Sequence, residues 1–271
     1  MMRALYTAAS GMRAQQTNVD NISNNIANVN TTAFKSQKTE FKSLLYQTIQ
    51  TRTTSANGEE KPIGAQVGLG TRVASNTTSY TQGALLEDES KSAFAIEGNG
   101  FFQVRGADGT TYYTRNGNFN WSIGPTGTTL TNTDGYPVLD SNGNTIVLPN
   151  NVNSEKAVVT TDGQVGYYNN AGAYVSMNRT IGLSQFNNPA GLEKAGSNLL
   201  RATNASGAAL NEATNANLTR SKIHQSYLEG SNVQGADEMV NLIVAQRAYQ
   251  LNSKAITTSD DMLEQANNLK R

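Results

Sequence analysis

The residue types that perform acid–base and nucleophilic chemistry are scarce in this chain and lack the neighbours that catalysis needs. His224 is the single histidine. It would be the natural base of a catalytic triad, but no Gly-x-Ser-x-Gly nucleophile elbow accompanies it. A structural or surface position is the commoner role for such a histidine. The 271-residue chain contains no cysteine, which excludes disulfides, thiolate catalysis and cysteine-ligated metal sites.

Two acidic stretches, residues 87–89 and 260–264, are the candidates for the paired carboxylates that cleave glycosidic bonds. Charged loops and solvated helix faces explain the same residues without any chemistry. The Gly-Asn-Gly sequence at 98–100 lacks the third glycine of a dinucleotide-binding fingerprint, and the chain has no Gly-Lys-Ser/Thr phosphate-binding loop. We therefore predict no catalytic residue, no cofactor and no metal site, and we expect a protein that is not an enzyme.

Composition limits the partners. The chain has 21 basic and 21 acidic residues and is formally neutral, so no strong field draws it to nucleic acid or to an anionic membrane. Its mean hydropathy of −0.49 describes a polar protein. Polar residues interrupt the first 30 positions, and no later stretch approaches the ~18 apolar residues of a membrane span. We expect neither a cleaved signal peptide nor a spanning helix.

The elements that must position any site are marked by glycine and proline. Gly11 is the single glycine before residue 58, none follows Gly235, and all five prolines lie between residues 62 and 189. Both residue types oppose helix formation and mark turns. The sequence therefore predicts long helices at the two ends, over residues 1 to about 50 and 236 to 271, and strands and turns between them.

Both predicted helices carry apolar residues at steps of seven, which is the pattern of an a/d helix seam. For a single helix, packing of an amphipathic face on a globular core would be the usual explanation. Here two ends of one chain share the same period, so we predict that they pair with each other. The predicted seam and assembly residues are Leu5, Met12, Val19, Ile22, Ile26 and Val29 in the first helix, and Leu242, Tyr249, Ile256 and Leu263 in the last.

The face opposite the first seam is rich in side-chain amides, including Asn18, Asn21 and Asn25, where an ordinary solvated helix carries Lys and Glu. Amides donate and accept hydrogen bonds and suit a crowded helical array. The free energy gained by burying one seam also offsets only part of the conformational-entropy cost of ordering a helix this long. We therefore expect the two terminal helices to be only marginally stable in the monomer. They should become fully ordered when neighbouring copies supply contacts.

The middle of the chain predicts an antiparallel β domain. Strand-like segments such as 101–105, 110–115, 118–121 and 164–168 alternate with turn signals. Phe102 and Val104 should share one strand face, and so should Phe119 and Trp121. Asp-Gly or Asn-Gly dipeptides typical of type I′ hairpin turns stand at 108–109, 116–117, 134–135, 142–143 and 162–163. The polar stretch 51–90 is too long for an ordinary connector, so we expect an extended or disordered arm there.

Two sequence blocks resemble the signatures of the bacterial flagellar rod and hook protein family. Residues 27–35 read Ala-Asn-Val-Asn-Thr-Thr-Ala-Phe-Lys, and residues 245–250 read Ala-Gln-Arg-Ala-Tyr-Gln. Both blocks occur in the family's order, and interior blocks such as Gly-Phe-Phe at 100–102 agree with it. The signature residues carried by this chain are Ala27, Asn28, Thr31, Phe34, Lys35, Gln246, Arg247, Ala248 and Tyr249.

Within the family, residues 44–70 are similar to an insertion found in the distal rod branch, and the chain length also suits that branch. One position departs from the pattern: Ala33 stands where the family commonly has glycine. We therefore expect no positive φ at this position and expect the first helix to run further through the junction than in relatives.

The resemblance implies an α+β fold in which terminal helices form a coiled coil around an inserted antiparallel β domain. The implied domains are 1–35 with 232–271 for the coiled coil, 36–90 for the extended arm and 91–231 for an outer β domain. It further implies a non-enzymatic distal rod subunit of the flagellar basal body. Such a subunit polymerises helically with copies of itself into the hollow shaft that transmits torque from motor to hook.

The implied partners are other copies of the chain, other rod and hook subunits, an outer-membrane ring bushing and the flagellar type III export apparatus, which would export the chain without a cleaved signal. No nucleic-acid partner is implied. Two alternatives stay open at this point. One is a proximal rod or hook subunit, and the other is an extracellular β-rich adhesin or glycan-cleaving enzyme.

Overall fold

The computed structural model describes residues 2–50, 64–124, 127–149, 152–169, 172–215 and 217–269. The chain forms two compact units. The first, which we call the helical unit, comprises Met1–Ala27, Gln37–Thr78 and Gln234–Arg271, and the second, which we call the β unit, comprises Asn28–Ser36 and Ser79–Val233. The predicted α+β class with antiparallel sheets is confirmed. The unit boundaries differ from the expected ones because residues 37–78 lie with the helices and residues 28–36 lie with the β-rich part.

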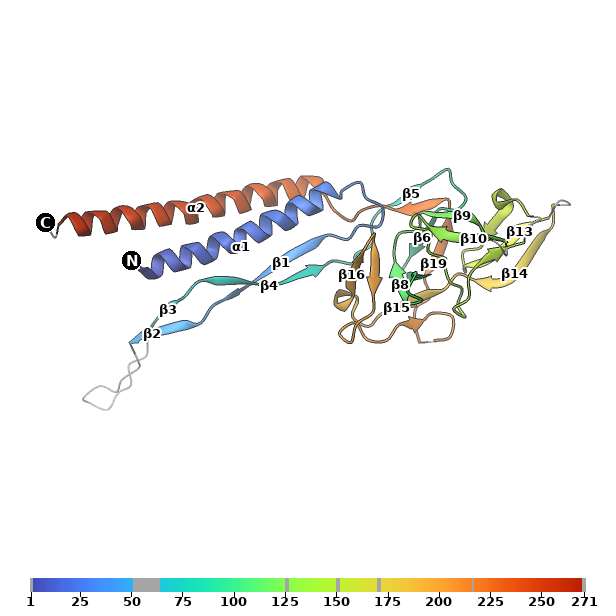
Figure 1. The fold of residues 1–271 in the computed structure, drawn as a ribbon, viewed down its shortest axis with the longest axis horizontal. Coiled ribbons are helices and arrows are strands. Elements are labelled where there is room, and N and C mark those ends of the chain that lie inside the picture. The colour runs from blue at the N-terminus through green and yellow to red at the C-terminus, as the bar shows by residue number, and fades with distance from the viewer. Residues whose placement is uncertain are drawn as a thin grey trace, which may run out of the picture. The chain divides into compact units, whose positions relative to one another are not determined.

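Two long helices dominate the helical unit. Helix α1 spans Met2–Ala27 and helix α2 spans Gly235–Asn268. They pack side by side and run in opposite directions (Figure 1). Asp237 and Glu238 lie in the first turn of α2, where negative charge favours the positive end of the helix dipole. The two helices therefore form one antiparallel pair.

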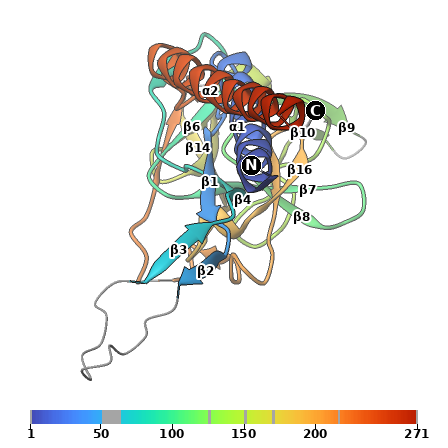
Figure 2. The same ribbon diagram turned by 90° about the vertical axis from the view of Figure 1, so that its left-hand side faces the viewer.

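The prediction of helix up to about residue 50 is wrong, because α1 ends at Ala27 and the chain returns as strands. Strand β1 (Gln37–Ser43) pairs with β4 (Thr71–Thr78), and β2 (Tyr46–Gln50) pairs with β3 (Ala65–Gly68). We call this pair of two-stranded segments the ribbon. Helix α1 lies between α2 and β1–β4 in both views (Figures 1 and 2). Part of the expected arm, residues 51–63, lies outside the described residues.

The β unit is built from antiparallel sheets. Its largest sheet has the strand order β16-β17-β8-β7-β15-β18, with β7 and β8 near its centre. The bounds of these strands are β7 Phe101–Arg105, β8 Thr111–Thr114, β15 Leu183–Gln185, β16 Glu193–Gly196, β17 Leu199–Arg201 and β18 Leu210–Asn211.

Smaller sheets complete the β unit. Strand β10 lies between β9 and β11, and β13 lies between β12 and β14. Strand β6 pairs with β19, and β5 pairs with β20. Two short 3₁₀ helices span Ser154–Lys156 and Pro189–Gly191. The remaining strands are β5 Leu85–Glu87, β6 Phe94–Glu97, β9 Phe119–Gly124, β10 Gly127–Asn132, β11 Val147–Leu148, β12 Ala157–Val159, β13 Gln164–Tyr168, β14 Tyr174–Thr180, β19 Lys222–Gln225 and β20 Tyr227–Glu229.

The core of the β unit has a larger and a smaller cluster, on opposite faces of β7. Phe102 and Val104 are fully buried in the larger cluster, where Phe119 joins them and Trp121 packs against the edge. This confirms both predicted strand faces. Phe101 points to the other face and contacts Tyr80 and Phe186 edge to face, with ring centroids 5.6 and 5.7 Å apart. Strand β7 is therefore buried on both sides.

The hairpin prediction was right about where the chain turns at four of the five dipeptides and wrong about the turn type. Gly109, Gly135, Gly143 and Gly163 have φ between 78° and 85°, but the Asp or Asn before each of them does not have positive φ. In each turn the glycine N–H donates to the carbonyl three residues earlier, as Gly109 does to Gly106 O at 3.0 Å. This is the type I turn with a glycine bulge, which needs one left-handed residue rather than two.

Gly117 makes no such turn. A Cβ at this position would lie 1.6 Å from the carbonyl oxygen of Phe94, so the glycine allows close approach of two backbones. Two consecutive left-handed residues, the pattern of a type I′ turn, do occur at Ser197 (φ 48°) and Asn198 (φ 58°), between β16 and β17. That turn was not predicted, because neither of its central residues is glycine.

Candidate functional site

The residues that first suggested chemistry occupy ordinary surface positions. His224 lies on β19 and bonds through Nε2 to Glu97 Oε2 at 2.9 Å, with both side chains partly exposed. This hydrogen bond holds the pKa of the Glu97 carboxyl below its usual value. Glu87 and Glu89 are exposed, and so are Asp260, Asp261 and Glu264 on α2. Within the described ranges no three His, Asp or Glu side chains gather as metal ligands.

Neither α1 nor α2 is both long enough and apolar enough to cross a membrane, judged over the residues that the structure describes.

The predicted seam residues lie along the two paired helices, but most of the fully buried helical positions carry small residues. Among the predicted residues only Ile22 is fully buried, and Tyr249 is 41 % exposed. The other predicted members of α1 and α2 are partly buried. The most buried helical positions besides Ile22 and Asn25 are Ala8, Gly11, Ala14 and Ala245. Val29 lies in a turn beyond α1 and belongs to the β unit, so it is not part of a helix seam.

Gly11 explains how closely the helices approach. A Cβ on this residue would come within 2.8 Å of the Asn252 side-chain nitrogen, so α2 rests against the backbone of α1 there. Small residues let two helix backbones come together, and large residues then flank the contact. The isolated glycine in an otherwise helical sequence was the available signal for this contact.

The amides of α1 bond within the chain. Asn25 is 1 % exposed, and its side chain donates to Gln37 O at 2.9 Å and accepts from Gln37 N at 3.0 Å. It also donates to Glu238 Oε1 of α2 at 3.3 Å. Asn21 donates to Thr39 of β1. At these positions the amides tie α1 to the ribbon and to α2, a function that the sequence analysis assigned to contacts in a crowded array.

Two grooves flank α1 in the helical unit. One, of about 540 Å³, runs between α1 and β4, and its lining includes Tyr6, Arg13, Thr17, Arg72 and Val73. We call it the α1–β4 groove. The other, of about 420 Å³, runs between α1, β1 and α2. Both are open to solvent in a chain with no partner bound.

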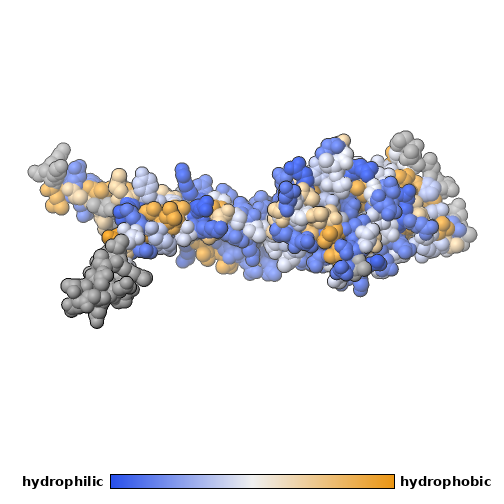
Figure 3. Space-filling view, turned by 90° about the horizontal axis from the view of Figure 1, so that it is seen from below, coloured by the Kyte–Doolittle hydropathy of each residue, from blue (hydrophilic) through white to orange (hydrophobic). Residues whose placement is uncertain are grey.

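Helix α2 also carries a second apolar stripe. Val240, Val244, Leu251 and Met262 follow one another at steps of four, seven and eleven, which places them on one side of a helix with 3.6 residues per turn. Their exposed fractions are 60, 62, 69 and 53 %. In the space-filling view, hydrophobic side chains reach the surface along the helical unit (Figure 3). Exposed apolar side chains on one side of a helix indicate an interaction site, and here Arg247 and Thr258 lie between them on the same side.

Family-signature residues near the start of the chain build a junction inside the β unit. Ala33 is buried with φ of 56°, and its N–H donates to Glu229 O at 2.7 Å. The expectation of an ordinary φ and a longer helix here is therefore wrong. A left-handed alanine costs about 1–2 kcal/mol, which the hydrogen bond and burial offset in this setting. Thr31 forms part of the turn before it, and the Phe34 ring lies 5.7 Å from Lys194 Nζ.

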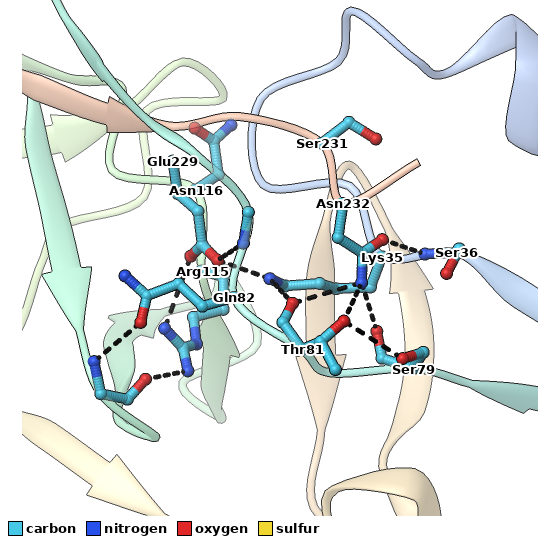
Figure 4. Close-up of polar contacts among 12 residues, drawn as sticks. Lys35, Ser36, Ser79, Thr81, Gln82, Arg115, Asn116, Glu229, Ser231 and Asn232 are labelled. Carbon is cyan, nitrogen blue, oxygen red and sulfur yellow. Dashed lines mark hydrogen bonds and ion pairs between the residues drawn. The ribbon is translucent and has the colours of Figure 1, made fainter. Parts of the chain in front are cut away.

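Glu229 joins two buried cations at this junction (Figure 4). Its side chain is 0 % exposed, and it pairs with Lys35 Nζ and, at 3.4 Å, with Arg115 Nη1. Burial lowers the pKa of Lys35, and the adjacent carboxylate of Glu229 opposes that shift. Arg115 also donates to Gly98 O and lies over the Phe101 ring, 5.1 Å from its centroid. Removing one partner of such a buried cluster leaves an uncompensated charge.

Asn232 ties together three passages of the chain at the edge of the β unit. Its side chain accepts from Ser36 N at 2.7 Å and donates to Ser79 O at 2.9 Å and Thr81 O at 3.2 Å (Figure 4). Ser79 N donates in turn to Ser36 O at 2.9 Å. The chain leaves the β unit after Ser36 and Val233 and re-enters it at Ser79. One amide therefore holds the three crossing points.

The remaining signature residues lie on the helices. Ala27 ends α1, and Asn28 begins the turn that follows. Gln246 and Arg247 are exposed on α2, Ala248 is partly buried and lines the groove beside β1, and Tyr249 follows it. Glu229, Arg115 and Asn232 were not among the predicted site residues. The only signal for Glu229 was a charged residue between Leu228 and Gly230 at the end of a predicted strand segment.

Comparison with known proteins gives matches along most of the chain. Residues 5–35 match the family described as flagella basal body rod protein, residues 95–167 match the flagellar hook protein FlgE/F/G D1 domain, and residues 224–269 match the flagellar basal body rod FlgEFG protein C-terminal family. The flagellar basal-body rod protein FlgG of Borreliella burgdorferi is 43 % identical over 272 residues, covering 100 % of both chains.

Two proteins of Bacillus subtilis give a useful contrast. Its flagellar basal-body rod protein FlgG is 39 % identical to this chain, and its flagellar hook-basal body complex protein FlhP is 31 % identical, each over 100 % of both chains. The higher identity falls on the rod protein.

Proposed function

The chain belongs to the flagellar basal-body rod and hook protein family, and we propose that it is the distal rod subunit, polymerising helically into the hollow shaft that carries torque from motor to hook. It is a structural rod protein of the flagellar basal body. The single observation that carries the polymer proposal is the exposed apolar stripe of α2. Leaving such large side chains in water forgoes about 1.5–3 kcal/mol each, so a neighbouring copy that covers them gains that free energy.

The paired helices support a coiled coil within each subunit. We propose that Leu5, Met12, Val19, Ile22 and Ile26 form one side of its seam. The other side consists of Leu242, Tyr249, Ile256 and Leu263. These residues are spaced at heptad intervals, and the helices that carry them are in contact. In a shaft, this pairing would make each subunit a stiff element that does not shear along its axis.

The ribbon supports the distal rod assignment over a proximal rod or hook subunit. Leu45, Tyr46 and Ile49 are 82, 62 and 60 % exposed on it. The expected arm was 36–90, and we propose that its residues 37–78, which lie in the helical unit, contact neighbouring subunits, with β1 to β4 as the described base. Deletion of residues 44–70, which keeps β1, β4 and the β unit, should change the curvature or stiffness of the polymer. If the polymer of the deleted chain kept its shape and length, the arm would not be the distal rod's stiffening insertion.

Other parts of the proposal concern partners. We propose contacts with other rod and hook subunits, passage through the type III export apparatus and a surrounding outer-membrane ring bushing. We also propose that the chain has no catalytic activity. The placement of His224 and the acidic stretches on exposed surfaces supports this, and incubation of the purified protein with peptidoglycan tests it. Release of soluble sugar fragments would contradict the non-enzymatic assignment.

Substitution in the seam tests the function directly. Ile256→Asp puts a charge into the partly buried side of α2 and should abolish polymerisation, measured by sedimentation and electron microscopy. The melting of the β unit, followed by the fluorescence of Trp121, should stay unchanged because Trp121 packs on the β-unit core. Ser253→Asp is the matched control on the exposed side of the same helix. Polymers of normal length from the Ile256→Asp chain would contradict the seam assignment.

A further inference from the structure

Among the residues that the structure describes, no second helix lies beside the far end of α2 (Figure 1). Gly11 lies against Asn252, and Met2 is nine residues before Gly11 while Asp261 is nine residues after Asn252. Because the helices run in opposite directions, residues 262–269 extend past the described start of α1, as Figure 1 shows. We call Asp260–Leu269 the overhang. Met262 and Leu269 are 53 and 88 % exposed on it.

The overhang presents an acidic face. Asp260, Asp261 and Glu264 are all exposed, and their spacing of one, three and four residues places them on one side of the helix. Over the ranges that the structure describes, none of these carboxylates forms an ion pair. Three adjacent carboxylates repel one another, and a cationic partner relieves that repulsion.

The α1–β4 groove has the opposite charge. Arg13 and Arg72 line it, and both side chains are exposed. Lys42 stands directly opposite Arg72 in the β1–β4 pairing, so two cations share one cross-strand position. Like charges in that position destabilise a ribbon. In the described part of the chain none of these three cations has an anionic partner.

The groove is also shaped and held open by the chain itself. Gly70 has φ of 119°, and a Cβ there would lie 2.1 Å from Ser10 Oγ, so the ribbon touches α1 at its floor. Thr71 N donates to Ser10 Oγ at 3.3 Å. Tyr6, Ala9 and Val73 supply apolar walls. A helix with apolar side chains next to an acidic face matches this combination of walls and charges.

We propose that the overhang of one copy docks in the α1–β4 groove of a second copy, with Asp261 and Glu264 facing Arg13 and Arg72. The proposal rests on the proposed self-assembly and specifies which surfaces meet. The contact joins two different surfaces of the chain, so each copy can use its overhang on one neighbour and its groove on another. Repetition of this contact yields an open helical polymer when the rotation between neighbours does not close a ring.

Charge exchange tests the pairing. Arg13→Glu with Arg72→Glu should raise the critical concentration for assembly by at least about tenfold, and so should Asp261→Arg with Glu264→Arg, because each places like charges across the contact. The chain carrying all four changes should assemble within about threefold of the unmodified chain. Circular dichroism of each variant monomer should match that of the unmodified monomer, which shows that the substitutions do not change its helix content. A quadruple variant whose critical concentration is raised as much as that of either double variant would overturn the proposal.

Cross-linking tests it independently of charge, and the absence of cysteine in the chain makes the readout clean. Monomers of Thr17→Cys, in the groove, are mixed with monomers of Asn268→Cys, on the overhang, assembled and oxidised. The expected product is a disulfide-linked pair of the two variants. The control mixes Thr17→Cys with Ser253→Cys, a position on α2 outside the overhang. This mixture should give at least about fivefold less disulfide-linked product.

The two proposals fail in different ways. If the unmodified chain forms polymers but Ser253→Cys cross-links as well as Asn268→Cys, the overhang contact is wrong and the rod function stands. If the unmodified chain forms no polymer under any condition in which its helices are folded, the proposed self-assembly is wrong and this contact falls with it.

Discussion

In the β unit, the carboxylate of Glu229 is buried between Lys35 and Arg115, and the large apolar side chains of β6 and β7 lie in closed clusters. In the helical unit, Arg13, Arg72 and Asp261 are exposed, and Leu251 is 69 % exposed. The first unit pairs its buried charges and packs its largest apolar side chains in a core within one chain. The second leaves both to be satisfied from outside. One polypeptide thus combines a unit whose core is complete within the chain with a unit that exposes a surface for a partner.

Limited proteolysis should show the largest difference between the two units. In dilute monomer, brief protease treatment should remove the exposed helical termini and leave a fragment close to Ser79–Val233, identified by mass spectrometry. Residues 28–36 should stay bound to that fragment, because Ala33 and Ser36 are hydrogen-bonded to Glu229 and Asn232. If the helical termini resisted the protease as well as the β unit does, the expected difference in stability between the two units would be wrong.

Glu229→Gln should destabilise the β unit by about 3–5 kcal/mol, because Lys35 and Arg115 then stay buried without the carboxylate that pairs with both of them. Urea unfolding followed by Trp121 fluorescence measures it. The matched control is Glu193→Gln, which breaks the exposed pair with Arg201 and should cost less than about 1 kcal/mol. Equal effects of the two substitutions would show that burial does not decide the strength of these ion pairs.

Asn25→Ala should weaken the attachment of the ribbon to α1 by about 1–3 kcal/mol, since Gln37 loses partners for both its N–H and its carbonyl. Hydrogen exchange at the Gln37 amide should accelerate accordingly. Asn18→Ala is the control, because the Asn18 amide bonds only weakly to Gln15, at 3.5 Å. The Trp121 unfolding curve should not move for either variant, and a shift would mean that the two units are energetically coupled.

Tyr80 gives the smallest and most selective test. Burial raises the pKa of Tyr80 from 10.0 to about 12. The unfolded chain therefore loses this proton at lower pH than the folded chain. The resulting stability is complete below about pH 10 and is lost as the pH rises towards 12, amounting to about 1–3 kcal/mol. Tyr80→Phe should flatten this alkaline loss, and the tyrosinate absorbance of the two proteins should differ by one group titrating near pH 12.

The regular parts of the fold follow from patterns that act locally. Residues 164–168 were predicted as a strand and form β13 with the same bounds, because alternation and a flanking Asp-Gly turn determine both ends. The family signatures likewise identified the family from short, ordered blocks. The antiparallel pair of terminal helices follows from the shared heptad spacing and from the absence of proline in both segments.

What could not be predicted depends on contacts between distant residues. The family's glycine was the available signal for a left-handed backbone at Ala33, but the alanine itself gives no such sign. The hydrogen bond that holds this conformation is accepted by Glu229, nearly two hundred positions away in the chain. Segment 37–43 has no strong strand signal. The Asn25 side chain holds it against α1 by bonding both the N–H and the carbonyl of Gln37, as a neighbouring strand would. The Asp-Gly turns were assigned the wrong type because the dipeptide suits two turn geometries, and strand register chooses between them.

The Asn232 amide has a mechanical consequence. Its bonds to Ser36, Ser79 and Thr81 connect the passages by which the chain leaves and re-enters the β unit. A pull on one passage is therefore transmitted to the other two, and the bonds are strained together rather than opened one after another. Bonds loaded in parallel rupture at higher force than bonds loaded in sequence. In a single-molecule pulling experiment, Asn232→Ala would convert one abrupt rupture into a gradual peeling at lower force.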